Sequence, residues 1–114
     1  MAAVPAGDPG EPFRRISVDE AMAMIERGGV QLVDVRQPNE YAAGHVPGSL
    51  LIPLDRLLER SSELSWQEDL IFVCAVGERS AVASEIAATV GRTRIMNMEG
   101  GMTAWAKRGF PIEK

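Results

Sequence analysis

The only cysteine of the chain, Cys74, stands where a thiol can act as a nucleophile. It follows the apolar run 70–73, which has the length of a buried strand, and it precedes residues 81–90, which have a helical pattern. The first N–H groups of a helix have no partner within the helix and carry partial positive charge. We therefore expect amides near Cys74 that favour the thiolate and can hold an anion beside it. The loop 74–80 is thus predicted to carry out sulfur nucleophile chemistry.

The residues that follow Cys74 suit such a loop. Gly77 allows the positive φ that a tight strand-to-helix turn needs, and Arg79 offers a positive charge and a planar set of donors for an oxyanion. Cys74 could instead be a small buried hydrophobe with an inert sulfur, but the spacing of Gly77 and Arg79 favours the functional interpretation. The predicted substrate-binding residues of the loop are Ala75, Val76, Gly77, Glu78, Arg79 and Ser80.

Loop length separates two kinds of cysteine chemistry. Cysteine-dependent phosphatases resemble one another in a Cys-x5-Arg cradle that fits a tetrahedral phosphate. In this chain four residues separate Cys74 from Arg79. The ring of amides is therefore expected to be smaller and to fit a sulfur atom carried on the cysteine. Phosphatase or arsenate reductase chemistry is disfavoured on this ground.

Strand-like and helix-like segments alternate along the chain. The predicted strands are 30–35, 49–52, 70–73 and 94–98, and the predicted helices are 18–27, a short one from Pro38, 54–64, 81–90 and 101–105. This alternation predicts an α/β fold with a parallel sheet covered on both faces. Ligands of such sheets bind beyond the carboxyl ends of the strands, where both Arg36 and Cys74 are expected.

Three helices carry more specific signals. Ser17 and Glu20 form a capping-box pattern at the start of the first predicted helix, and Gly28 is placed to end it. Ser80 is expected to be the N-cap of the helix after the cysteine. Two apolar faces are predicted from helical spacing: Val82, Ile86 and Val90 in one helix, and Leu54, Leu57, Leu58 and Leu64 in the other.

Length and composition exclude several functional classes. The chain of 114 residues is long enough for one domain, and its net charge of −4 without a basic stripe argues against nucleic-acid binding. No apolar segment approaches the roughly 20 residues of a membrane span. Residues 1–12 are rich in Ala, Pro and Gly and are expected to be a disordered leader rather than a secretory signal. A single cysteine fits a reducing compartment, so we expect a cytoplasmic protein.

Three blocks of sequence together are similar to the single-domain rhodanese family of sulfurtransferases. The first block, 32–49, resembles the family pattern D-x-R-x-x-x-E-[FY]-x-x-G-H-[IV]-P-G, and the second, 74–80, resembles the C-x-x-G-x-R-S loop. The third block, 99–111, resembles the closing G-G-x-x-x-W…G-x-P signature. The resemblance covers about residues 16–111, and three blocks in order at compatible spacing make chance a poor explanation.

The resemblance implies a fold and a reaction. The fold is a rhodanese-like three-layer α/β/α domain with a five-stranded parallel sheet, over residues 13–114. The reaction is sulfur transfer: Cys74 is the catalytic nucleophile that takes a sulfane sulfur from thiosulfate or a persulfide donor. The resulting Cys74 persulfide passes the sulfur to a thiol or to cyanide.

The resemblance also bears on partners. It implies no metal and no organic cofactor. The implied partners are a small-molecule sulfur donor, thiosulfate or a persulfide, and a possible sulfur-acceptor protein. The alternative function is a non-catalytic rhodanese-like module that binds a partner protein. The intact Cys74 argues against that alternative, because a binding module has no need of the thiol.

Two residues near the predicted sheet edge have competing interpretations. Arg36 either helps to hold an anionic donor or forms a structural ion pair with Asp34 or Glu40. His45, the only histidine, either forms a dyad with Cys74 or belongs to the structural turn that its Gly-His-Val-Pro-Gly setting resembles. The structural interpretation is favoured for His45.

Two residues of the loop depart from common relatives. Glu78 places a negative charge beside Arg79, and a carboxylate facing Cys74 would raise the pKa of the thiol and repel thiosulfate. Val76 stands where many relatives have a small polar residue, so a hydroxyl donor is missing. Both features favour a neutral donor or the persulfide of a partner protein over thiosulfate.

Overall fold

The computed structural model describes residues 10–114, and it contains one parallel sheet with strand order β1-β5-β4-β2-β3. The strands are β1 (Arg14–Ile16), β2 (Val30–Asp34), β3 (Leu50–Leu51), β4 (Asp69–Val73) and β5 (Ile95–Met98). The helices are α1 (Val18–Arg27), α2 (Pro38–Ala43), α3 (Glu78–Thr89) and α4 (Gly101–Lys107). The five-stranded parallel α/β fold is confirmed. No helix within residues 10–114 is long and apolar enough to cross a membrane.

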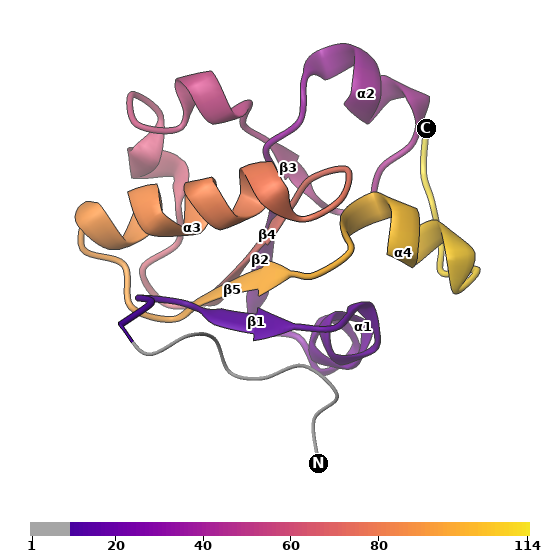
Figure 1. Cartoon of the computed structure of the whole chain (residues 1–114), viewed down its shortest axis with the longest axis horizontal. Helices are drawn as coiled ribbons and strands as arrows, with labels where there is room; N and C mark the ends of the chain where they lie inside the picture. Colours follow the sequence, from indigo (N-terminus) through magenta and orange to yellow (C-terminus); the bar gives the residue numbers. More distant parts are fainter. Residues whose placement is uncertain (1–9) are drawn as a thin grey trace.

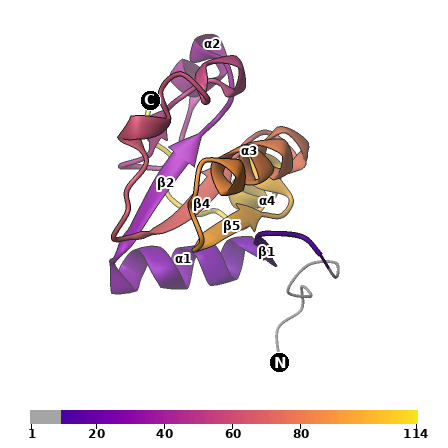
Figure 2. The ribbon, with the colours of Figure 1, turned by 90° about the vertical axis from the view of Figure 1, so that its left-hand side faces the viewer.

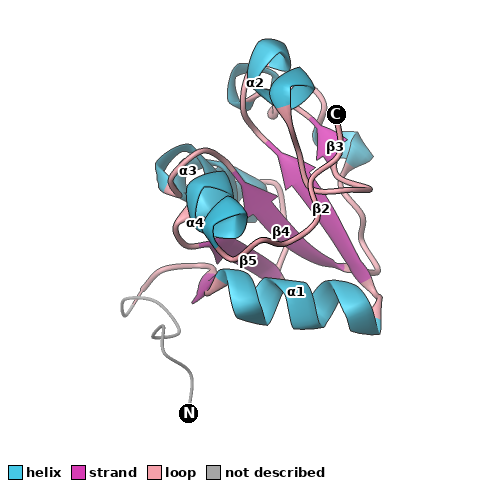
Figure 3. Cartoon of the chain, turned by 90° about the vertical axis from the view of Figure 1, so that its right-hand side faces the viewer, coloured by secondary structure: helices cyan, strands magenta, loops and turns pink. Residues whose placement is uncertain are grey.

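Helices cover both faces of the sheet (Figures 1 and 2). On one face α3 and the segment 54–64 pack over a cluster that includes Phe72 and Ile95. On the other face α1 and α4 pack over a cluster that includes Ile71 and Trp105. Figure 3 shows α2 beyond the end of β2, apart from both layers. The two clusters alternate along β4, because neighbouring residues of a strand point to opposite faces.

The predicted signals of α1 and α2 are confirmed. Ser17 Oγ accepts from the Glu20 N–H at 3.0 Å, and the Glu20 carboxylate accepts from the Ser17 N–H at 3.0 Å. Gly28 is the C-cap of α1, with φ of 83°, where a side chain would be strained. Pro38 occupies the first turn of α2, where its missing N–H costs nothing.

The predicted helix 54–64 is wrong. The segment forms two short 3-10 helices, Leu54–Arg56 and Ser61–Glu63, joined by a turn, and Leu58 is 64% exposed. Arg92 Nη2 donates to the carbonyl oxygens of Ser61 and Leu64 at 3.1 and 3.0 Å. Because these two carbonyls accept hydrogen bonds from Arg92, they do not need the i to i+4 hydrogen bonds of a continuous α-helix.

The start and the buried face of α3 also differ from prediction. Gly77, not Ser80, is the N-cap, and it has a left-handed φ of 101°. The predicted apolar face is wrong at Val82, which is 47% exposed. The face against the sheet is made of small side chains instead: Ser80, Ala83, Ser84 and Ala87. Small residues let α3 lie close to β4 and β5, so its N-terminus comes close to the end of β4.

The first strand, β1, is the one that the sequence analysis did not locate. It has three residues, Arg14–Ile16, and pairs with β5 at one edge of the sheet. Two arginines in three residues give no apolar alternation. Residues 1–9 of the predicted leader lie outside the described residues, and in 10–12 the Glu11 carboxylate accepts from Arg15 Nε at 3.0 Å.

The N-terminus of α4 packs directly on the backbone that follows β4 (Figure 1). Gly101, the first residue of α4, has φ of 55°. A Cβ on Gly101 would lie 2.6 Å from both the carbonyl carbon and the carbonyl oxygen of Ala75. Only glycine fits here, because neither neighbour is a flexible side chain that could move aside.

Gly101→Ala is therefore expected to destabilise the domain more than Gly109→Ala does. Gly109 also has a positive φ, 72°, but open space around its Cβ position. Both variants place alanine in the left-handed region, at about 1–2 kcal/mol, and Gly101→Ala adds about 1–3 kcal/mol of steric overlap. Urea unfolding of the two variants measures the difference. Equal losses of unfolding free energy would contradict the close approach of α4.

Candidate active site

The sulfur of Cys74 lies inside the loop that connects β4 to α3. Cys74 is 1% exposed, and its Sγ accepts from the Gly77 N–H at 3.1 Å. The Ser80 hydroxyl lies 3.4 Å from the same sulfur. Ser80, expected to be a helix cap, is instead buried in the first turn of α3. The loop thus surrounds the thiol with donors on several sides.

These donors change the acidity of the thiol. Burial acts to raise the pKa of Cys74 by disfavouring the charged form, and it is the largest single influence. The Ser80 hydroxyl and the backbone N–H groups of Ser80, Gly77 and Val76 act in the opposite direction and together outweigh burial. The pKa of Cys74 is therefore lowered from its ordinary value. A thiolate is the nucleophilic form of cysteine, so the loop favours reactivity.

Two carbonyl groups at the start of the loop are held by α4. The Met102 N–H donates to the Cys74 carbonyl at 2.8 Å, and the Thr103 N–H donates to the Ala75 carbonyl at 3.0 Å. In a trans peptide the C=O and the following N–H point in opposite directions. The Val76 N–H is thereby turned toward the sulfur side of the loop. The free N–H groups of the first turn of α4 find their partners in the same contact.

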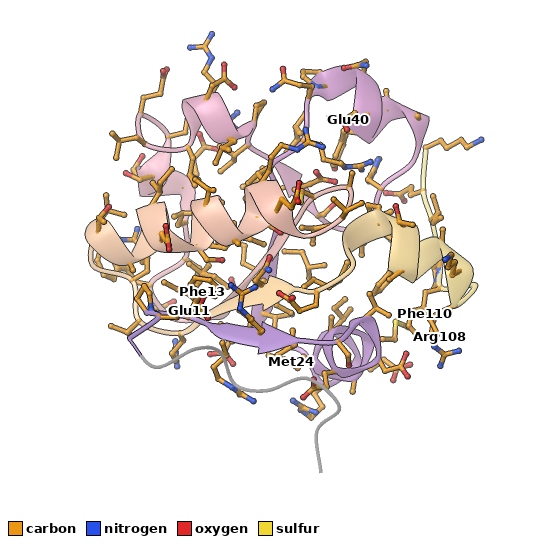
Figure 4. All side chains as sticks on the ribbon, viewed as in Figure 1. Glu11, Phe13, Met24, Glu40, Arg108 and Phe110 are labelled. Carbon is orange, nitrogen blue, oxygen red and sulfur yellow. The ribbon has the colours of Figure 1, made fainter. Side chains whose placement is uncertain are left out.

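Arg79 lies at the rim of the loop and is held by α2. Its Nη1 and Nη2 donate to the two carboxylate oxygens of Glu40 at 2.8 and 2.9 Å (Figure 4 labels Glu40). The Arg79 hydrogen bond, followed by the backbone N–H of Gln37, lowers the pKa of Glu40 to about 2. Glu40 in turn raises the pKa of Arg79, and the negative charge of Cys74 contributes to that rise. The guanidinium therefore stays positively charged, has Glu40 as its ion-pair partner, and still attracts a negative charge on Cys74.

The two loop residues that depart from common relatives both face outward. Val76 is 54% exposed, and Glu78 is exposed at the start of α3. The pKa of Cys74 is set by its burial and by hydrogen-bond donors of Ser80, Gly77 and Val76, and Glu78 is not among these influences. Of the two orientations considered for Glu78, the structure favours the one toward solvent.

Arg36 reaches the same edge of the sheet but forms an ion pair there. β2 and β4 are neighbours, with Asp34 in register with Val73, so their carboxyl ends lie together. Arg36 Nε and Nη2 donate to the Asp34 carboxylate at 2.9 and 2.7 Å, and Nη2 also donates to the Gly44 carbonyl at 2.8 Å. Arg36 is only 6% exposed. This is the structural interpretation of Arg36, and its role as a donor-binding residue stays a prediction.

His45 belongs to a separate group of contacts. Its ring stacks on Tyr41 with centroids 3.7 Å apart, and its Nδ1 lies 2.8 Å from the Tyr41 carbonyl oxygen. Its Nε2 lies 3.4 Å from the Glu113 carboxylate. His45 therefore joins α2 to the C-terminal segment, as expected for a structural turn.

Sequence reasoning missed Asn97 as part of the site. Asn97 is completely buried in β5, and its Nδ2 donates to the Gly77 carbonyl at 3.2 Å. The signal was present in the sequence, because an asparagine interrupts an otherwise apolar strand, and buried polar side chains are usually held by specific hydrogen bonds. The contacts from α4 had no such signal, since they use backbone N–H groups alone.

Comparison with known proteins gives a consistent result. The family model for the Rhodanese-like domain matches residues 17–108. The chain is 39% identical over 83 residues to a sulfurtransferase of Allochromatium vinosum, covering 73% of this chain and 78% of that protein. It is 36% identical over 107 residues to an HTH-type transcriptional regulator of Mycobacterium tuberculosis, covering 92% of this chain. The chain spans only 47% of that regulator, about half its length.

A solved structure shares the fold. The crystal structure of a rhodanese-related protein from Thermoplasma volcanium superposes with a TM-score of 0.82 at 31% identity. The match covers 89% of this chain and 98% of that one. The match to the family model, the sequence relatives and the shared fold agree, and the chain belongs to the rhodanese-like domain family.

Proposed function

We propose that this protein is a sulfurtransferase that carries a sulfane sulfur as a persulfide of Cys74. One observation carries the proposal: the sulfur of Cys74 accepts from the Gly77 N–H at 3.1 Å, inside a loop whose donors lower its pKa. The sulfurtransferase relative supports the same reaction type. The free thiol of Cys74 also suits a reducing compartment, and we propose the cytoplasm.

The reaction has two transfers. The Cys74 thiolate attacks the outer sulfur of thiosulfate or of a persulfide. A new S–S bond forms to Cys74, and the donor S–S bond breaks, releasing sulfite or a thiolate with the bonding electron pair. An acceptor thiolate or cyanide then attacks the outer sulfur of the Cys74 persulfide. The enzyme S–S bond breaks and the Cys74 thiolate leaves, so no external oxidant or reductant is needed.

The loop provides the binding site for the transferred sulfur. In the proposed role, the N–H groups at Ala75, Val76, Gly77 and Ser80 stabilise the charge on Cys74 and on its outer sulfur, as fixed donors do for other developing anions. Glu78 and Arg79 form the rim that the donor meets. Arg36 positions the end of β2 through its pair with Asp34. These roles rest on the contacts of the loop and on its match to the family pattern.

The charges at the rim favour one class of donor. Arg79 is paired with Glu40 and Arg36 with Asp34, so both guanidiniums have a neutralising partner. Glu78, the residue before Arg79, adds an exposed negative charge. A dianion such as thiosulfate gains little from such a rim, because its attraction to each paired arginine is offset by the partner carboxylate. We propose that an organic or protein-bound persulfide is the better donor.

The persulfide is detected by mass. After incubation with thiosulfate or a glutathione persulfide, the intact protein should gain roughly 32 Da, the mass of one sulfur atom, and cyanide should remove the gain. Cys74→Ser should fold and show no gain. The persulfide donor should load the protein faster than thiosulfate at equal concentration. Absence of an adduct with either donor would contradict the proposal and favour the non-catalytic binding module.

The Glu40–Arg79 ion pair should make stability depend on acid pH. The pKa of Glu40 in the folded protein is about 2, below its ordinary value of 4.5. The carboxylate therefore stabilises the fold fully above about pH 4.5, and this contribution is lost as pH falls toward 2. Both side chains are about one-third exposed, so we expect about 1 kcal/mol at pH 7 from this well-aligned pair.

Comparing wild type with Glu40→Gln by urea unfolding tests this expectation. The difference in unfolding free energy should stay constant above about pH 5 and shrink between pH 4.5 and 2. Glu78→Gln, which removes one neighbouring negative charge without breaking the pair, is the matched control. A difference between wild type and Glu40→Gln that does not change across this pH range would mean that the pair does not stabilise the fold.

A further inference from the structure

Asn97 is a completely buried polar side chain on the strand beside the catalytic loop. It lies in β5, in register with Phe72 of β4, and both neighbours in sequence, Met96 and Met98, are buried apolar residues. Phe72, in β4, and Cys74, directly after it, are two residues apart and face the α3 side of the sheet, as their shared cluster shows. Asn97 thus lies below the loop, on the same side as Cys74.

Asn97 belongs to a chain of hydrogen bonds that runs from the sheet edge to the sulfur. Arg15 Nη1 on β1 donates to the Glu99 carboxylate at 3.1 Å. The same carboxylate oxygen accepts from Asn97 Nδ2. Asn97 Nδ2 also donates to the Gly77 carbonyl at 3.2 Å, and the Gly77 N–H donates to Cys74 Sγ at 3.1 Å. This series of hydrogen bonds therefore links Arg15, in β1, to Cys74, in the loop that follows β4.

The direction of the Asn97 amide follows from its neighbours. Both groups that Nδ2 meets, the Gly77 carbonyl and the Glu99 carboxylate, are acceptors only. The opposite orientation would place the Asn97 oxygen against two acceptor oxygens. In the observed orientation Oδ1 is buried without a hydrogen-bond partner among residues 10–114. Asn97 therefore acts here as a hydrogen-bond donor, although its side-chain oxygen has no partner in the described part of the chain.

We propose that Asn97 is a positioning residue for Cys74. Its hydrogen bond to the Gly77 carbonyl restrains ψ of Gly77 near 0°, and with φ of 101° this is the conformation in which the Gly77 N–H, on the preceding peptide, meets Sγ. The α4 contacts fix the Cys74 and Ala75 carbonyls, and Asn97 does the same for Gly77. Its effect on turnover rests on the proposed function, but its effect on the thiol does not.

The test compares Asn97→Leu with wild type. Leucine has nearly the same shape and removes both the donor and the unpaired oxygen. Without its partner, the Gly77–Glu78 peptide can rotate about ψ of Gly77. The conformation of Gly77 is then no longer fixed, and its N–H, which belongs to the preceding peptide, loses its alignment with the thiolate. We expect the pKa of Cys74 to rise by about one pH unit, so that the rate of alkylation by iodoacetamide below neutral pH falls up to about tenfold. Because Cys74 is the only cysteine, alkylation reports on it alone.

Ala87→Gly is the matched control for lost stability. Ala87 is buried on α3, about two turns beyond Ser80, and glycine there costs about 1 kcal/mol without touching the loop. Its alkylation profile should match wild type. If Asn97→Leu does not fold, Asn97→Ser, whose side chain is too short to reach the Gly77 carbonyl, replaces it with the same expected shift. An unchanged Cys74 profile in the folded Asn97 variant would overturn the proposal.

The readout separates this inference from the proposed function. Alkylation needs no sulfur donor, so the role of Asn97 is measured even in a protein that forms no persulfide. A wild-type protein that never gains sulfur would refute the sulfurtransferase and leave the positioning role to be decided by the pH profile. If both hold, loading by a persulfide donor should slow in Asn97→Leu at low pH and approach the wild-type rate where both thiols are ionised.

Discussion

The site depends on the outward direction of the carbonyl groups in one short loop. A peptide group presents its N–H on one side and its C=O on the other, so a ring of inward N–H groups exists only if the carbonyls have partners outside. The first turn of α4 takes the Cys74 and Ala75 carbonyls, and Asn97 on β5 takes that of Gly77. The parallel sheet makes this possible, because it brings the end of β5 and the start of α4 to the loop that follows β4.

Side-chain charges near the sulfur are largely paired with one another. Asp34 forms an ion pair with Arg36, and Glu40 forms one with Arg79. Backbone dipoles and the Ser80 hydroxyl are therefore the main source of stabilisation for a thiolate. Such donors act over short distances and suit an extra sulfur atom attached to Cys74, whereas a net positive rim would attract free anions from a distance. The proposed preference for a persulfide donor over thiosulfate rests on this difference.

Much of the fold was predictable because its signals are local. The alternation of apolar runs with capped helices indicates a parallel sheet, and the C-x-x-G-x-R-S spacing marks the loop. In the segment 54–64 the helical spacing of Leu57 and Leu64, both buried, predicts a continuous helix. The structure differs because Arg92, far along the chain, donates hydrogen bonds to the carbonyls at positions 61 and 64. Ser80 has the residue type of an N-cap, but its hydroxyl faces the sulfur. The Glu40–Arg79 pair joins residues 39 positions apart, and such contacts have no local pattern.

The acidity of Cys74 in the native protein tests the account most directly. The thiolate absorbs in the ultraviolet, and subtracting the titration of Cys74→Ser removes the contribution of the one tyrosine, so the difference reports the single cysteine of the folded chain, with the urea-unfolded chain as its reference. The account predicts a lower pKa in the folded protein than in the unfolded one, because the loop donors outweigh burial. A folded-state pKa equal to or above the unfolded value would mean that burial dominates and that the loop does not stabilise the thiolate.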